Sequence, residues 1–133
     1  MPPTATTPSR RNRWARWRAR ALWWLHIAVE GGVGGLMLAN PALMFPGAGA
    51  AVHKLARPFG LAALCLAALG WLTLRWPHSA AVRIAATVLS GYHGGIALLQ
   101  IVQPMAGLPI WLAPLFHGLL ALGFGRAARR AQV

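Results

Sequence analysis

The sequence contains almost no acidic side chains. Its 133 residues include one carboxylate, Glu30, against 13 lysines and arginines, and charged residues make up only 11% of the chain. Soluble domains contain about 25% charged residues, and so few charges cannot cover the surface of a soluble fold of this length. The scarcity of charge therefore excludes an ordinary soluble domain and favours a membrane protein.

The chain also lacks the short motifs that accompany common chemistries. Its single cysteine, Cys65, lies in an apolar run and cannot form an internal disulfide, and CxxC, CxxCH, HExxH and glycine-rich phosphate loops are absent. Neither Ser90 nor Cys65 has an evident general base. An enzymatic role stays open, but it is not the expected one.

The basic residues suit a membrane better than a nucleic acid. Despite a net charge of +12, they flank apolar runs instead of following one polar face, and nucleic-acid-binding motifs are absent. Such flanks are typical of topology signals and of contact with anionic lipid head groups. The expected partner is therefore the lipid bilayer, and no nucleic acid is expected.

Apolar segments of nearly spanning length occur four times. A transmembrane helix needs about 20 apolar residues, and the segments run over about 21–39, 55–74, 80–102 and 108–125. Proline-containing connections separate them, at 40–47, 76–78 and 103–109. The period-two alternation of a membrane barrel is absent. We predict an all-α fold with a four-helix antiparallel transmembrane bundle over 21–125.

The distribution of basic residues predicts the orientation, because cytoplasmic flanks contain an excess of lysine and arginine. One side holds the Arg10–Arg20 and Arg126–Arg130 clusters with Arg75 and Arg83, and the other holds only Lys54 and Arg57. We expect a multi-pass protein of the bacterial inner membrane with both termini in the cytoplasm. Residues 1–20 form a disordered basic tail with an interfacial segment, and 126–133 form a basic C-terminal tail.

Small residues form a stripe along each predicted helix. The stripes are His26, Glu30 and Gly34; His53, Ala56, Gly60, Ala63, Ala67 and Gly70; Ala86, Ser90, His93, Ala97 and Gln100; and Ala113, His117 and Ala121. Small residues allow helix backbones to approach in lipid. The residues expected at helix contacts are Gly31, Gly34, Gly35, Gly60, Gly91 and Gly95, since Gly31/Gly35 and Gly91/Gly95 also have the GxxxG spacing.

The embedded polar residues fall on or beside these stripes and should face the bundle interior. Counting along each segment places Glu30, His93 and His117 near the membrane midplane, within reach of one another. His26 lies one helical turn to the cytoplasmic side of Glu30, and Tyr92 can contribute a hydroxyl if it faces inward. His53 and Gln100 lie toward the outer side.

Several roles for this cluster of His26, Glu30, Tyr92, His93 and His117 are compatible with the sequence. A structural Glu–His pair can hold helices in register. Proton-linked or ion-coupled transport through Glu30 is the leading functional hypothesis, because embedded ionisable residues mark such pathways. The chain resembles small multidrug-resistance exporters in one respect, a glutamate in the first of four short helices.

Other roles remain open beside transport. No cofactor is expected, although haem or a metal ion at His93 and His117 is conceivable. The chain can also serve as an accessory or assembly subunit of a larger membrane complex, or form a homo-oligomer.

Three segments have a recognisable pattern: GGVGGLMLANPALMFPG (31–47), ARPFGLAALCLAALG (56–70) and YHGGIALLQ (92–100). They resemble the DoxX-like group of small four-helix bacterial membrane proteins, and the resemblance extends over about 21–125. It implies a four-helix membrane protein. Because some members associate with quinone-linked or redox enzymes, it also allows a redox partner.

Overall fold

The computed structural model describes residues 10–102 and 111–131, with side chains described from residue 20 onward. Within these ranges the chain is helical and contains no strand, which confirms the all-α class. The helices are α1 (Arg10–Ala39), α2 (Pro41–Met44), α3 (Ala50–Arg75), α4 (Ser79–Val102) and α5 (Leu112–Arg130).

Three helices are long and apolar enough to cross a membrane. They comprise Arg20–Ala39 of α1, all of α3 and all of α4. Large apolar side chains face outward along them, such as Ile84, Leu98 and Leu99, each more than 60% exposed. This outward apolar surface fits a lipid environment and supports a membrane-embedded protein. The 19-residue α5 is not among the three, so a fourth span stays a prediction.

The N-terminal basic segment is more helical than the predicted disordered tail. α1 runs without interruption from Arg10, so 10–12 are helical and not part of a disordered tail; 1–9 lie outside the described residues. From Arg10 to Glu30 the sequence has no glycine or proline and is rich in arginine and alanine, which favour helix. At the other end α5 continues through Arg130.

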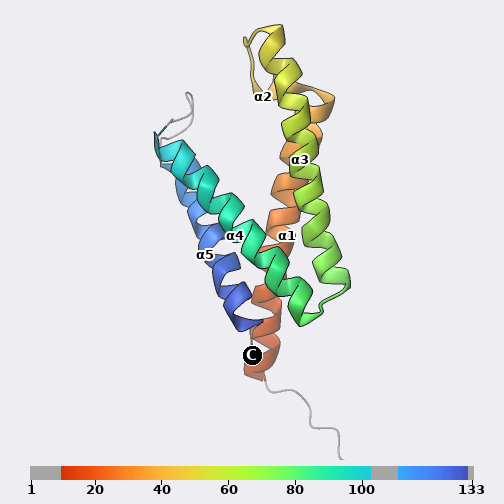
Figure 1. Ribbon diagram of the computed structural model, residues 1–133, viewed down its shortest axis with the longest axis vertical. Helices are drawn as coiled ribbons and strands as arrows, with labels where there is room; N and C mark the ends of the chain where they lie inside the picture. The colour runs from red at the N-terminus through yellow and green to blue at the C-terminus, as the bar shows by residue number, and fades with distance from the viewer. Residues whose placement is uncertain (1–9, 103–110, 132–133) are drawn as a thin grey trace, which may run out of the picture.

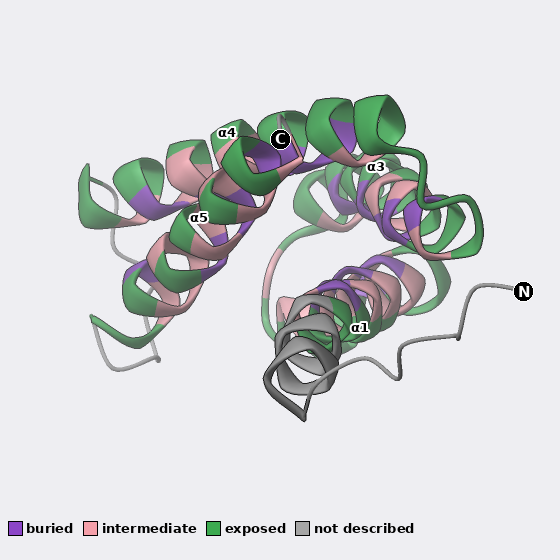
Figure 2. Ribbon diagram, turned by 90° about the horizontal axis from the view of Figure 1, so that it is seen from below, coloured by how far each residue is buried: buried purple, intermediate pink, exposed green. Residues whose placement is uncertain are grey.

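The four long helices form two antiparallel pairs, which we call the α1/α3 hairpin and the α4/α5 hairpin (Figure 1). The hairpins meet toward the end that holds the chain termini and diverge toward α2. The expected single bundle is therefore a V-shaped arrangement of two pairs. Figure 2 shows buried residues on the facing sides of the helices and exposed residues on the outside.

Glycine sets the contact within the α1/α3 hairpin. A Cβ added at Gly34 would lie 2.7 Å from the carbonyl oxygen of Gly60, and one at Gly60 would lie 2.7 Å from that of Gly34. The buried face of α3 follows its small-residue stripe: Ala56, Gly60, Ala63, Ala67, Gly70 and Thr73. The two backbones thus approach more closely than any side chain at Gly34 or Gly60 would permit.

The GxxxG pairs themselves do not make this contact. Among the described residues, a Cβ at Gly35, Gly91 or Gly95 would meet no atom of another helix within 4 Å, and one at Gly31 would meet only Ala67 Cβ, at 3.9 Å. The predicted packing role of Gly35, Gly91 and Gly95 is therefore wrong for contacts within the chain. α4 instead buries Ala85, Ala86, Leu89, His93 and Ala97.

A compact apolar core joins the hairpins near their meeting point. It consists of Trp23, Ala85, Ala86, Leu89, Leu120, Phe124 and Ala128. Trp23 of α1 packs edge-on against Phe124 of α5, with ring centroids 5.0 Å apart. Leu22 fills the space beside Gly123, where a Cβ would lie 3.0 Å from Leu22 Cδ1. Side chains, not backbones, therefore make the contact between the hairpins.

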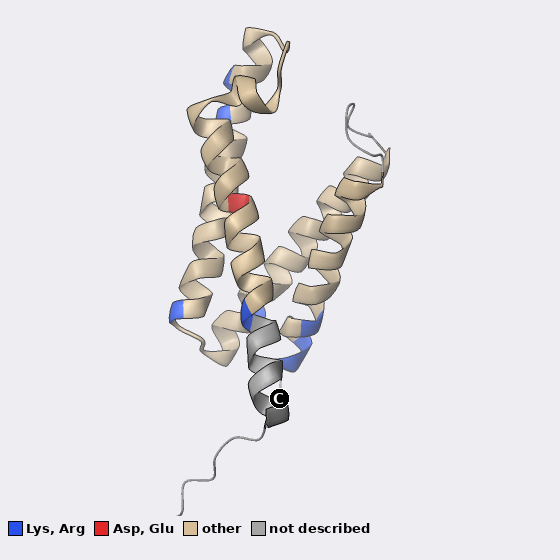
Figure 3. Ribbon diagram, turned by 180° about the vertical axis from the view of Figure 1, so that it is seen from behind, with Lys and Arg blue, Asp and Glu red and all other residues tan. Residues whose placement is uncertain are grey.

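The described charges lie where the orientation hypothesis needs them. Arg20, Arg75 and the last turn of α5 lie toward the end of the molecule that holds the termini, while Lys54 and Arg57 begin α3 at the opposite end. Figure 3 shows the basic residues gathered at both ends and the single carboxylate between them. The orientation relative to the cytoplasm stays a prediction.

Candidate functional site

Three histidines from three helices form one hydrogen-bonded chain. His26 Nδ1 of α1 lies 3.0 Å from His93 Nε2 of α4, and His93 Nδ1 lies 2.9 Å from His117 Nδ1 of α5. His26 Nε2 lies 3.0 Å from the carbonyl oxygen of Leu66 in α3. His26 and His93 are completely buried and His117 is half-buried. The chain therefore connects all four long helices.

Gly70 allows His26 to reach α3. A Cβ at position 70 would lie 3.0 Å from His26 Cδ2 and 3.6 Å from His26 Nε2. Because position 70 has no side chain, the imidazole can lie against the α3 backbone and donate to the Leu66 carbonyl. This contact pairs a glycine on α3 with a histidine on α1, and neither residue alone indicates it in the sequence.

The Leu66 carbonyl fixes the direction of every hydrogen bond in the chain. A carbonyl only accepts, so His26 Nε2 is the donor, and a neutral His26 then presents a lone pair at Nδ1. His93 must donate from Nε2 and accept at Nδ1, and His117 must donate from Nδ1. Neutral rings are the relevant forms here, because an isolated charge inside the membrane is costly.

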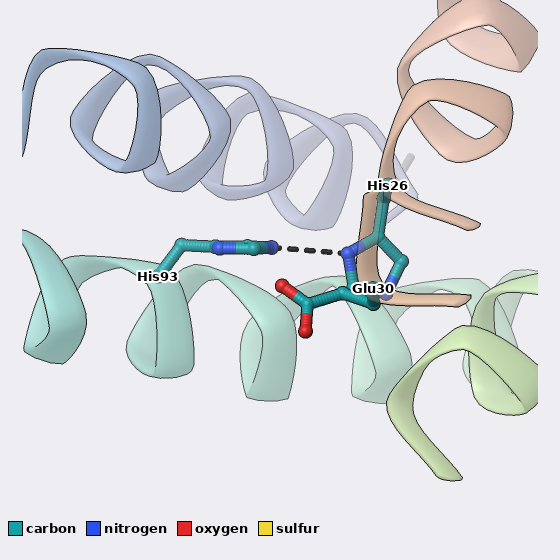
Figure 4. A group of neighbouring side chains, drawn as sticks. All are labelled: His26, Glu30 and His93. Atoms are coloured by element: carbon teal, nitrogen blue, oxygen red, sulfur yellow. Dashed lines mark hydrogen bonds between the residues drawn. The ribbon is translucent and has the colours of Figure 1, made fainter. Parts of the chain in front are cut away.

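Glu30 lies one turn beyond His26 on the same face of α1, as the i, i+4 spacing requires. Its side chain is 4% exposed, and Oε2 accepts a hydrogen bond of 3.1 Å from the Tyr92 hydroxyl of α4. Glu30 is thus held by a tyrosine and not by the histidines that the sequence suggested as partners. Its carboxylate nevertheless lies beside the imidazoles of His26 and His93 (Figure 4).

No protein-family model, curated protein or solved structure matches this chain. The DoxX-like resemblance therefore stays a prediction.

His26, Glu30 and His93 form the one group in the described residues that is arranged to hold a metal ion. One ligand atom from each lies within 4.8 Å of the other two. Around a tetrahedral Zn²⁺ with bonds of about 2.05 Å, ligand nitrogens are about 3.3 Å apart. The 3.0 Å separation of His26 Nδ1 and His93 Nε2 is already close to that value. The Glu30 carboxylate, with an oxygen within 4.8 Å of a ligand nitrogen of each histidine, is the third candidate ligand.

The remaining residues that the sequence singled out lie elsewhere. His53 Nε2 donates to the Phe45 carbonyl at 3.0 Å and thereby fastens the connection between α2 and α3. Gln100 is half-buried near the far end of α4, and no side-chain hydrogen bond joins it to the cluster. The stripe predicted on α5, Ala113, His117 and Ala121, is half-buried. The fully buried residues of α5 are Pro114, Leu120, Phe124 and Ala128.

Two further residues lie around the imidazoles: Phe124, which the sequence pattern did not indicate, and Ser90, which was expected on the interior stripe of α4. Phe124 packs against both buried histidines, stacked with His93 at a centroid distance of 5.9 Å and edge-on to His26 at 5.3 Å. Ser90 donates to the Ala121 carbonyl at 2.9 Å and ties α4 to α5 one turn from His93. Phe124 thus restricts the position of the His93 ring, and Ser90 holds α4 against α5 beside it.

Proposed function

We propose that the protein binds one divalent transition-metal cation in the membrane interior, through His26 Nδ1, His93 Nε2 and the Glu30 carboxylate. The observation that supports this most strongly is the convergence of these three buried groups, from two hairpins, within 4.8 Å. Two imidazoles and a carboxylate suit zinc, iron, copper or nickel, whereas magnesium and calcium prefer oxygen ligands alone.

The hydrogen bonds behind the ligands support the same proposal. Metal-bound histidines typically donate their second N–H to a carbonyl, which orients the ring, and His26 makes such a bond to Leu66. If His93 Nε2 held the cation, the His93 proton would lie on Nδ1, and this N–H would donate a hydrogen bond to His117 Nδ1. His117 then keeps its proton on Nε2. The three rings hold the same number of protons in both states, so they need not become charged.

The position of Glu30 argues against a purely structural cluster. A structural Glu–His pair would use an imidazole N–H as the donor to the carboxylate. Here the Tyr92 hydroxyl donates to the Glu30 carboxylate, while the imidazoles of His26 and His93 hydrogen-bond to each other. This arrangement leaves the carboxylate free to exchange the tyrosine hydroxyl for a cation, which would neutralise its own charge in the membrane.

We also propose that all four long helices span the bacterial inner membrane with both termini in the cytoplasm, on the basis of the basic flanks. In a Cys65→Ala background, a membrane-impermeant maleimide added to intact cells should fail to label Ala5→Cys or Ala131→Cys. It should label Ala48→Cys, in the connection between α2 and α3. Labelling at position 5 or 131 from outside would contradict this orientation.

Cobalt binding tests the metal site. Protein purified without a histidine tag in detergent should bind one equivalent of Co²⁺ and develop the visible d–d bands of a four- or five-coordinate complex, which Zn²⁺ should abolish. Glu30→Gln keeps an oxygen that accepts from Tyr92 but removes the anionic ligand. We expect this variant to bind Co²⁺ at least about tenfold more weakly.

His53→Gln is the matched control, because it removes a histidine that lies outside the cluster. It should bind cobalt as the wild type does, while His93→Gln should not. If the folded wild-type protein takes up no Co²⁺ or Zn²⁺, the proposal fails. Proton conduction by such a metal-free protein would then favour proton-linked transport, and a Soret band in the purified protein would favour haem.

A further inference from the structure

We infer that the cation bound at this site is a transported ion, which enters and leaves as the two hairpins move relative to each other. The inference rests on the proposed metal site and assigns a role to it, the transport of the bound ion. Three features support it: the ligands are divided between the hairpins, the hairpins are joined by few contacts, and Tyr92 holds Glu30 when no ion is bound.

The ligands belong to two separate bodies. His26 and Glu30 are on α1 of the α1/α3 hairpin, and His93 is on α4 of the α4/α5 hairpin. A cation at the site therefore connects the hairpins. Conversely, any movement that separates α1 from α4 separates His93 from the other two ligands and releases the ion.

Each hairpin is packed tightly within itself. Backbone contact at Gly34 and Gly60 closes the α1/α3 hairpin. In the α4/α5 hairpin, a Cβ at Gly125 would lie 3.2 Å from Ser90 Oγ, and Ser90 also bonds the Ala121 carbonyl. Close-packed pairs of this kind move as units, because their contacts do not deform gradually.

The connection between the hairpins is much lighter. Among the described residues, two side-chain hydrogen bonds join them, His26 to His93 and Tyr92 to Glu30, and both involve the site. The remaining contacts are apolar side chains around Trp23 and Phe124. Beyond this junction the hairpins diverge toward the α2 end (Figure 1). Rocking of two helical units around a central site is a general route to alternating access.

Tyr92 explains how the site can be emptied. A carboxylate left alone in the membrane interior would be costly, but the half-buried Tyr92 hydroxyl already bonds Glu30 while His26 bonds His93. The empty state is therefore satisfied by hydrogen bonds within the protein. A resident structural metal would instead be expected in a closed site with four protein ligands.

Zinc uptake tests the inference. Full-length protein is reconstituted into phosphatidylethanolamine/phosphatidylglycerol vesicles that contain a zinc-sensitive dye, and Zn²⁺ is added outside. We expect saturable uptake above that of protein-free vesicles. The initial rate should fall by at least about tenfold in Glu30→Gln, whereas His53→Gln should match the wild type.

A Co²⁺ titration of the same preparations separates the two proposals. If the wild type binds one equivalent but its vesicles take up no more zinc than protein-free vesicles do, transport is excluded and the metal site stands. If it binds none, both proposals fail. Uptake that persists undiminished in a Glu30→Gln protein of native helical content would also overturn the inference, because the ion would then cross by another route.

Discussion

Replacing His93 with leucine is expected to lower the free energy of unfolding by about 2–4 kcal/mol, measured without bound metal. His93 is completely buried and bonds His26 on one side and His117 on the other. Leucine would leave both partners without a hydrogen bond in an apolar interior, at about 1–3 kcal/mol for each stranded group. Hydrogen bonds between membrane helices often contribute less, so we expect a loss in the lower half of the sum for the two stranded groups.

The matched control is His78→Leu, because His78 is exposed and makes no side-chain hydrogen bond in the described structure. It should change stability by less than about 0.5 kcal/mol. Denaturation of both variants by SDS in mixed micelles, with a chelator present and tryptophan fluorescence as the signal, gives the comparison. Equal stability of His93→Leu and the wild type would mean that the histidine chain does not hold the hairpins together.

Sequence patterning was informative about the helices and about which face of α3 is buried. The recurrence of alanine and glycine at alternating spacings of four and three residues from Ala56 to Gly70 has one structural explanation, a narrow face toward another helix, and that face is buried. The GxxxG pattern was a weaker guide. On α4, Gly91 and Gly95 point away from any helix in the described chain, because the bulkier Leu89 and His93 face the core.

The sequence predicted which residues form the site, but not which of them hydrogen-bond to each other. Counting residues along a helix gives depth, so Glu30, His93 and His117 were expected at one level. It gives neither the rotation of each helix nor its tilt in the V. The structure consequently adds His26 to the histidine chain, with His93 between His26 and His117, and pairs Glu30 with Tyr92.

The contacts that the site makes with the backbone of α3 were also not predictable from the sequence. The Leu66 carbonyl determines the tautomer of His26, and the missing side chain of Gly70 makes that contact possible. Both depend on the register between α1 and α3, which hydrophobic periodicity does not specify. The same register depends on Gly34 and Gly60. A substitution at the glycine contact should therefore also disturb the contact of His26 with α3.

Gly34→Ala is expected to destabilise the protein by about 1–3 kcal/mol, the usual range for overpacking. The new Cβ would lie 2.7 Å from Gly60 O and 3.0 Å from Leu64 N. Both are backbone atoms, which cannot turn aside as a flexible side chain could, so α1 and α3 must separate. Gly35→Ala is the control from the next position, where a Cβ would meet nothing within 4 Å. It should be neutral or stabilise by up to about 1 kcal/mol, because alanine favours helix over glycine.

The double variant Gly34→Ala/Gly60→Ala distinguishes a local contact from a general intolerance of these helices to alanine. A Cβ at Gly60 would meet Gly34 O at 2.7 Å, so both substitutions force apart the same pair of backbones. Once either has separated them, the second meets less resistance, and the double variant should lose clearly less stability than the sum of the single losses. Strictly additive losses in SDS denaturation would show that Gly34 and Gly60 act independently, and that their mutual contact does not set the spacing of α1 and α3.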